Sequence, residues 1–277
     1  MPDLFIKKTG QAEFNVEDQV TGMHYLQMAR TPPTMVGTYV TNAGQDGERK
    51  FGQSAYGPGT ITLSFYYEGY DYNTFRLATH DIYRLLSDRD FLRIRDSIEP
   101  GIVAMVEPET YEMTKQGVSE YSFDVPCDVK AAHRQSLYRS DSPYLWQSGA
   151  WQFGMNIPFD EACHQYVFTG NNCSVYNPSD IDIDPYWQRH DLKITIKAVG
   201  SPKLINAQNG STFQYNSTMT ANDTLVLDGV TALLNGTDVT KDTNLGYLKL
   251  DRLTMNQIAV TGCTVKEIRV SFPFLYL

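Results

Sequence analysis

Apolar and polar residues alternate along much of this chain, which predicts a mainly β protein. The run Ile61–Tyr66 alternates and is rich in β-branched and aromatic residues, as is typical of a strand. Tyr121–Cys127 alternates strictly and places Tyr121, Phe123 and Val125 on one face. These two runs predict strands that each bury one side in a core.

Residues 71–86 depart from this alternation and predict the one long helix of the chain. Asp71 is suited to cap it, because its carboxylate can accept from an unpaired amide of the first turn. Ser87 and Asp88 end the pattern. One face is apolar at a period near 3.6, with Phe75, Ala78, Ile82, Leu85 and Leu86. The other face is polar, with Arg76, His80, Asp81 and Arg84.

The region before the helix predicts a long hairpin from about Tyr39 to Tyr56. The stretch 42–50 between its strands is polar and Gly-rich, and its Asp46-Gly47 pair suits a hairpin turn. Further short strands are expected in the first half, at Phe5–Lys7, Val36–Val40, Leu92–Arg95 and Ile102–Val106.

Residues 131–149 are polar and irregular and predict a joint between two domains. Beyond them short strands recur at spacings of about 8 to 12 residues, the pattern of an antiparallel β-sandwich. We expect domains at 1–141 and 142–277, with the last strand able to return to the first domain. The expected strands are Tyr166–Phe168, Ser174–Asn177, Leu192–Lys197, Thr212–Tyr215, Thr224–Leu227, Tyr247–Leu250, Asn256–Val260 and Lys266–Phe272, with turns that include Thr261-Gly262.

Composition narrows the class of protein. The net charge of -9 argues against sequence-independent binding of nucleic acid, and no sequence-specific contact is indicated. No apolar stretch reaches the roughly 18 to 20 residues of a membrane span, and residues 1–8 lack the apolar region of a signal peptide, so neither membrane insertion nor the usual export is expected. The four cysteines show no metal spacing, and small buried hydrophobes are favoured over a Cys163–Cys173 disulfide.

Catalytic and metal motifs give no support to an enzyme, a metal site or a cofactor. The chain has no nucleophile elbow, zinc-protease motif, phosphate loop or dinucleotide fingerprint. The acids of Asp180–Asp184 could bind calcium, but a strand with its acids in water, ended by Pro185, is favoured. Neither His164 nor His190 has a companion at ligand or triad spacing. Glu107 and Glu109 flank a proline and indicate a turn.

Aromatic residues are frequent in the second half, where a sugar platform competes with a core or a protein interface. The core or interface is favoured; if the sugar alternative held, Trp151, Tyr186 and Trp187 would be the contacts. The residues concerned are Trp146, Trp151, Phe153, Tyr166, Tyr176, Tyr186 and Trp187.

The order of these elements resembles the distal tail proteins of long-tailed (siphovirus) bacteriophages, of the type that infects Gram-positive hosts. In the first half the resemblance rests on Tyr70–Tyr72 with Arg76, Ile82–Leu86, Pro100–Val103 and Phe123–Cys127. In the second half it rests on Trp151–Gly154, Val175–Asn177, Ile205-Asn206, Asn209-Gly210 and Phe272–Leu277.

The resemblance implies a structural hub of the tail tip or baseplate, rather than an enzyme. The first domain would be a β-rich belt, with one helix and a long hairpin, that forms a hexameric ring. The ring would join the major tail tube protein to the tail-associated hub or lysin protein at the distal end of the virion tail, after assembly in the host cytoplasm. A galectin-like second domain, which lacks the galectin sugar-binding set here, would carry receptor-binding or other baseplate proteins.

Within this frame the polar face of the helix is expected to set the register between neighbouring copies. The expected inter-subunit contacts are Arg76, His80 and Arg84 on the helix, and Glu48 and Arg49 in the hairpin. Two alternatives stay open: a module that binds host saccharide, and a cell-wall hydrolase, which lacks a supporting acid pair.

Overall fold

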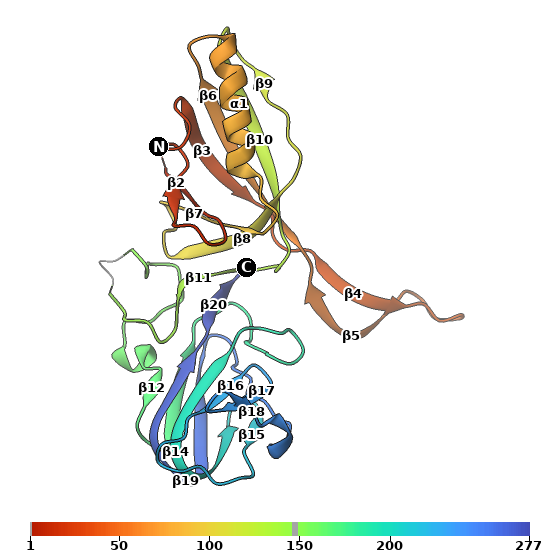
Figure 1. The fold of residues 1–277 in the computed structure, drawn as a ribbon. Helices are drawn as coiled ribbons and strands as arrows, with labels where there is room; N and C mark the ends of the chain where they lie inside the picture. Colours follow the sequence, from red (N-terminus) through yellow and green to blue (C-terminus); the bar gives the residue numbers. More distant parts are fainter. Residues whose placement is uncertain (1, 146–148) are drawn as a thin grey trace. The chain divides into compact units, whose positions relative to one another are not determined.

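The computed structural model describes residues 2–145 and 149–277 (Figure 1). The chain divides into two compact units. The first unit extends to Arg134 and also contains Leu277, and the second unit is Gln135–Tyr276. Along the chain, the division between the units therefore falls at 134/135, whereas the sequence predicted a boundary at 141/142.

The first unit is built on an antiparallel sheet with the strand order β2-β1-β7-β8-β10-β6-β3. Strands β6 and β10 pair over their whole length, and the inward positions of β6, from Ile61 to Tyr67, are buried. The strands are β1 (Leu4–Lys7), β2 (Phe14–Asn15), β3 (Met23–Arg30), β6 (Gly59–Glu68), β7 (Leu92–Asp96), β8 (Ile102–Pro108) and β10 (Glu120–Val129), and β9 (Thr114–Lys115) pairs with β10.

Helix α1 (Tyr72–Leu86) lies on this sheet, as the sequence predicted (Figure 1). Asp71 caps it: its Oδ1 accepts from the backbone N of Thr74 at 2.7 Å. The ring of Phe75 stacks on Tyr121 of β10 with the ring centroids 3.4 Å apart. Four residues complete the buried face, namely Ala78, Ile82, Leu85 and Leu86.

The predicted hairpin is also present, as β4 (Met35–Val40) and β5 (Arg49–Tyr56). These strands form a separate two-stranded sheet, and they extend away from the sheet of the first unit (Figure 1). We call residues 35–56 the arm.

The second unit is an antiparallel β structure whose centre is the long pair β14 (Lys193–Asn206) and β19 (Thr254–Ser271). The sheet runs β12-β19-β14-β16-β17-β18, with β13 on β19 and β15 on β14. The remaining elements are β11 (Arg134–Arg139), β12 (Val167–Phe168), β13 (Asn172–Asn177), β15 (Thr212–Gln214), β16 (Leu225–Asp228), β17 (Thr231–Leu234), β18 (Thr237–Asp238), β20 (Pro273–Tyr276) and the 3₁₀ turns η2 (Glu161–His164) and η3 (Thr240–Asp242). The predicted fold class, mainly β with one helix and a long hairpin before a β-sandwich, is confirmed.

Several local predictions were wrong, including the strand expected at Asp180–Asp184, of which only the isolated bridge at Ile183 forms, and the turn expected at Glu107 and Glu109, where β8 continues to Pro108. The expected turn at Thr261-Gly262 is an irregularity inside one continuous strand, β19, where the register with β14 shifts and Gly262 has a φ of +77°. A Cβ on Gly262 would lie 2.4 Å from the backbone O of Ser201, so the strands approach too closely there for a side chain. Tyr247–Leu250 forms only an isolated bridge from Leu250 to Ile183 instead of a strand.

The irregular structure expected for residues 131–149 was wrong in part, because Arg134–Arg139 form strand β11, which pairs with β20. The buried hydroxyl of Ser136 accepts from the backbone N of Phe274 at 2.9 Å, and that of Ser140 accepts from Phe272 at 3.1 Å. These bonds satisfy polar groups that would otherwise be costly to bury.

All four cysteines carry free thiols, and Cys127, Cys163 and Cys173 are buried, as predicted for small hydrophobes. Burial raises the pKa of the Cys127 thiol to about 12, so this thiol stays protonated at neutral pH. Within the described ranges, no helix combines the length and the apolar composition that a membrane span needs.

Candidate assembly surfaces

The arm exposes apolar side chains on both of its faces. Tyr39 and Val40 are consecutive in β4, so their side chains point to opposite faces, and both are exposed. Phe51 on β5 is 74% exposed. The set of exposed apolar residues is Met35, Val36, Tyr39, Val40, Phe51 and Tyr56. An isolated two-stranded hairpin is marginally stable in water, and exposed apolar side chains that lie together mark contact sites, so the arm is a candidate contact surface.

The end of the arm is charged. Glu48 lies in the exposed connection between the two strands, and Arg49 begins β5 opposite Val40. Both predicted contact residues are therefore on the surface of the arm, next to its apolar positions.

The outer face of helix α1 carries the other predicted contact residues. Arg76, His80 and Arg84 are all exposed. Arg84 forms an ion pair with Asp81 of the same helix at 2.9 Å, and Nη1 of Arg76 donates to the hydroxyl of Tyr72 at 3.5 Å.

Exposed apolar residues stand among these charges. Leu77 is 72% exposed, and Tyr72 and Tyr83 are also exposed. The face predicted to be polar is thus mixed, which suits a protein contact better than a purely solvated face does. Leu77 does not belong to the apolar period, so the prediction of a polar face did not include it.

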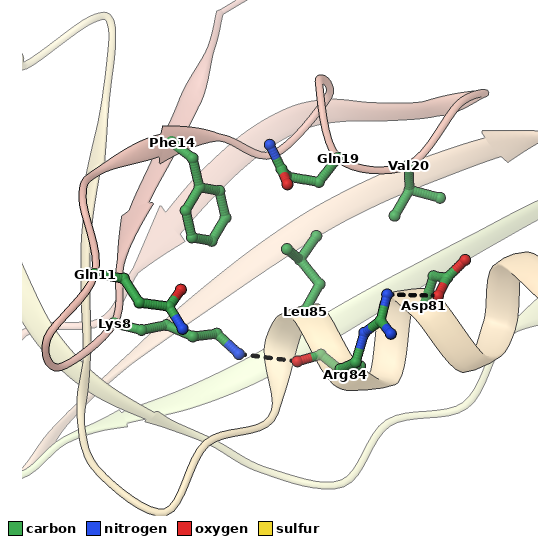
Figure 2. A pocket seen from close by; sticks show the side chains of 8 residues that line it. All are labelled: Lys8, Gln11, Phe14, Gln19, Val20, Asp81, Arg84 and Leu85. Carbon is green, nitrogen blue, oxygen red and sulfur yellow. Dashed lines mark hydrogen bonds and ion pairs between the residues drawn. The ribbon is translucent and has the colours of Figure 1, made fainter.

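Beside the end of helix α1 lies an open pocket of about 260 Å³ (Figure 2). Asp81, Arg84 and Leu85 line it from the helix, and the segment from Lys8 to Val20 lines the other side. The ammonium of Lys8 donates to the backbone O of Arg84 at 2.8 Å and to that of Ser87 at 3.2 Å. A cation at a helix C-terminus complements the helix dipole, so Lys8 fixes the end of the helix that presents Arg84.

The N-terminal segment is held by a carboxylate shared between two arginines. Glu13 bonds Arg95 through both of its oxygens, the closest contact being 2.6 Å, and it reaches Arg93 at 3.0 Å. Burial acts to raise the pKa of Glu13, but the hydrogen bonds and charges of Arg95 and Arg93 outweigh it, and the pKa is lowered. Glu13 is therefore ionised at neutral pH.

In the second unit, Trp151 does not meet the requirement for a sugar contact. It is 2% exposed, its ring stacks on Tyr144 and lies against Phe274, and its indole N donates to the backbone O of Pro143 at 2.9 Å. Trp151 is a core residue, because its ring is covered by other rings. Trp146 lies outside the described residues.

Tyr186 and Trp187, by contrast, are exposed. The ring of Tyr186 stacks on Tyr247 with the centroids 5.1 Å apart, and Trp187 meets Tyr186 edge-on. Tyr247 was missed as part of this cluster because its position in the sequence predicted a strand.

The acids and histidines considered for metal binding have other roles. Asp182 forms an ion pair with Lys249 at 2.9 Å, and the carboxylate of Asp184 accepts from the backbone N of Tyr186 and of Trp187. The His164 ring stacks on Tyr144, and His190 is largely buried, which lowers its pKa. In the part of the chain that the structure describes, no group of three or more His, Cys, Asp or Glu side chains is placed to hold a metal ion.

Comparison with known proteins finds a family model that matches part of the first unit. Residues 11–123, which include the helix and the arm, match the model of the phage tail protein RIFT-related domain. Part of the first unit is therefore similar to a phage tail RIFT-related domain. No curated protein matches the chain by sequence.

Solved structures resemble the whole chain. The crystal structure of SPP1 Dit, described as a paradigm of the hub adsorption apparatus in phages that infect Gram-positive bacteria, matches with a TM-score of 0.70 at 10% identity, over 99% of each chain. A chain of the phage p2 baseplate in its activated conformation with Sr matches with a TM-score of 0.42 at 9% identity, over 99% of this chain and 98% of that one. The predicted resemblance to distal tail proteins is confirmed at the level of the fold, and the matched residues 11–123 include both candidate surfaces.

Proposed function

We propose that this chain is a structural protein of the phage tail tip or baseplate, in which copies of the RIFT-related tail domain form a closed ring of six. The arm is the observation that carries the proposal, because both of its faces carry apolar side chains that the described residues leave exposed. The family match and the fold shared with SPP1 Dit support the same role.

A ring is the assembly that such an arm suits. In a ring, one surface of each copy meets a different surface of the next copy. An arm with two apolar faces can lie between neighbouring copies, with each face buried against protein. The charges of Glu48 and Arg49 would then fix the register of the contact rather than supply its affinity.

The outer face of helix α1 is the second contact in this proposal. Leu77 and Tyr83 supply apolar area, and Arg76, His80 and Arg84 surround it with charge. An apolar centre with a charged rim is the usual anatomy of a protein interface.

The neighbours of the ring follow from the resemblance to distal tail proteins. The ring would join the major tail tube protein to the tail-associated hub or lysin protein at the distal end of the virion tail. The second unit would carry receptor-binding or other baseplate proteins, and the chain would act as a scaffold rather than as an enzyme.

Native mass spectrometry of the purified chain tests the ring. We expect a species near six chains for the unmodified protein, either alone or with its tube and hub partners. The double variant Tyr39→Asp/Phe51→Asp should shift the mass to smaller species, because it places a charge on the arm. Phe153→Asp changes an exposed aromatic of the second unit and should leave the mass unchanged.

Two results would contradict the proposal. One is a chain that stays monomeric at all concentrations and in the presence of both partner proteins. The other is a double variant that forms the ring as well as the unmodified protein does, since the arm would then have no part in assembly.

A further inference from the structure

A rigid loop in the second unit presents two aromatic rings to solvent. The carboxylate of Asp184 accepts from the backbone N of Tyr186 at 3.0 Å and from that of Trp187 at 2.9 Å. The loop closes where the backbone N of His190 donates to the O of Asp184 at 3.1 Å. Residues 184–190 are thus tied at both ends, and the rings project from a fixed base.

The rings are arranged as a corner. Tyr186 lies flat on Tyr247, with an interplanar angle of 16°, so one face of Tyr186 is covered. Trp187 stands at 87° to Tyr186 and is 74% exposed. A large indole held this far into water presents apolar area that a ligand can cover.

Polar groups surround these rings. Gln188 and Arg189 follow Trp187 in the same loop, and both are exposed. Arg189 has a φ of +55°, the left-handed conformation in which non-glycine residues are rare and cluster at functional sites. The loop therefore combines two exposed aromatic rings with an exposed amide and an exposed guanidinium group.

We propose that the Tyr186–Trp187 loop is a binding site for a neutral saccharide, whose pyranose ring lies on the exposed face of Trp187. A pyranose has an apolar face and a rim of hydroxyls, and the loop has an aromatic face beside hydrogen-bonding groups. Gln188 and Arg189, both exposed in the same loop, would supply hydrogen bonds to the hydroxyls. A few placed polar groups around an apolar surface are typical of a small-molecule site.

A small ligand suits the dimensions of the site better than a protein partner does. A stable protein interface buries about 800 Å² on each partner, with several apolar residues at its centre. Within residues 184–190 the exposed apolar area is that of two rings, and the residues that follow them are polar. The inference is independent of ring assembly, because all of its residues belong to the second unit.

Titration with D-glucose, D-galactose and N-acetyl-D-glucosamine tests the site, with calorimetry and tryptophan fluorescence as readouts. We expect saturable binding of at least one of the three. Trp187→Ala should weaken it by roughly tenfold or more, because the stacking face is lost. Trp187→Phe keeps a ring and should retain part of the affinity, and Phe153→Ala is the control that should retain all of it.

Three outcomes overturn the proposal. The first is the absence of saturable binding for all three sugars, and the second is equal binding by the Trp187→Ala variant. The third is a Trp187→Ala variant that lowers the mass of the assembled ring, whether or not it binds sugar. The loop would then be a protein contact. Unchanged thermal unfolding of the Trp187 variants shows that the fold is intact.

Discussion

Replacing Ile82 by alanine tests how firmly helix α1 is held on the first unit. Ile82 is fully buried, on the helix face that contacts the sheet. The change removes three carbon atoms, which at about 0.8 kcal/mol per buried CH₂ is a loss of about 2.4 kcal/mol. The cavity left behind adds to this, so a total of about 3 to 4 kcal/mol is expected.

Leu77 offers a matched control, because it lies on the same helix and is 72% exposed. Leu77→Ala should change the free energy of unfolding by no more than about 0.5 kcal/mol. The two variants lose the same number of carbon atoms and gain the same residue. The difference between them therefore isolates burial.

Hydrogen exchange measured by mass spectrometry on peptides covering residues 72–86 gives the readout. A loss of about 3 kcal/mol corresponds to exchange roughly a hundredfold faster in Ile82→Ala, against little change in Leu77→Ala. All three tryptophans lie beyond Arg134, so tryptophan fluorescence reports the second unit and should stay constant. Equal protection in the two variants would refute the view that this face anchors the helix.

Three further predictions follow from the ion pairs and the buried histidine. Arg76→Glu with Arg84→Glu should reduce ring mass in native mass spectrometry but leave unfolding within about 0.5 kcal/mol, because the Arg84 pair is exposed; a double variant with an unfolded first unit would contradict this. Glu13→Gln should destabilise the first unit by about 1 to 3 kcal/mol in urea unfolding, because Arg93 and Arg95 lose their charged acceptor. An unchanged midpoint of urea unfolding would contradict this. Burial lowers the pKa of His190, so as the pH falls this imidazole is protonated in the unfolded chain before it is protonated in the folded chain. The second unit should therefore lose stability as the pH falls below about 6.5. His190→Gln should flatten that part of the pH profile in tryptophan-monitored unfolding, and an equally steep profile would count against burial as the cause.

Local signals in the sequence were sufficient for helix α1 and the arm. The helix combines an apolar period of 3.6 with an aspartate cap, and the arm combines the apolar run Val36–Val40 with a polar, glycine-rich turn. Both signals come from residues close together in the chain, which is why they could be found without the structure.

Strand β11 and the irregularity in β19 depend on distant residues. Ser136 and Ser140 look like loop residues until the backbone of β20 is present to pair with them. Gly262 has the sequence context of a turn, but β19 continues through it because the strand pairs with β14, where Ser201 lies close to Gly262. Tertiary pairing prevailed over local propensity in both places.

Burial was the other quantity that the sequence could not provide. Trp151 and Trp187 belong to the same aromatic-rich region, and one is in the core while the other is in water. The apolar residues of the arm have the composition of a buried strand. Whether another part of the chain covers a ring depends on the fold, and this cannot be predicted from composition.

The two-faced arm has a consequence for how assembly ends. In any open row of copies joined through the arm, the last copy keeps an arm with a face in water. Adding one more copy only moves that exposed arm to a new end, whereas closing the row into a circle removes it. Burial of the apolar area of this single terminal arm would thus stabilise a closed circle relative to a growing filament. This stabilisation is gained in the step that closes the circle, and not when each copy is added.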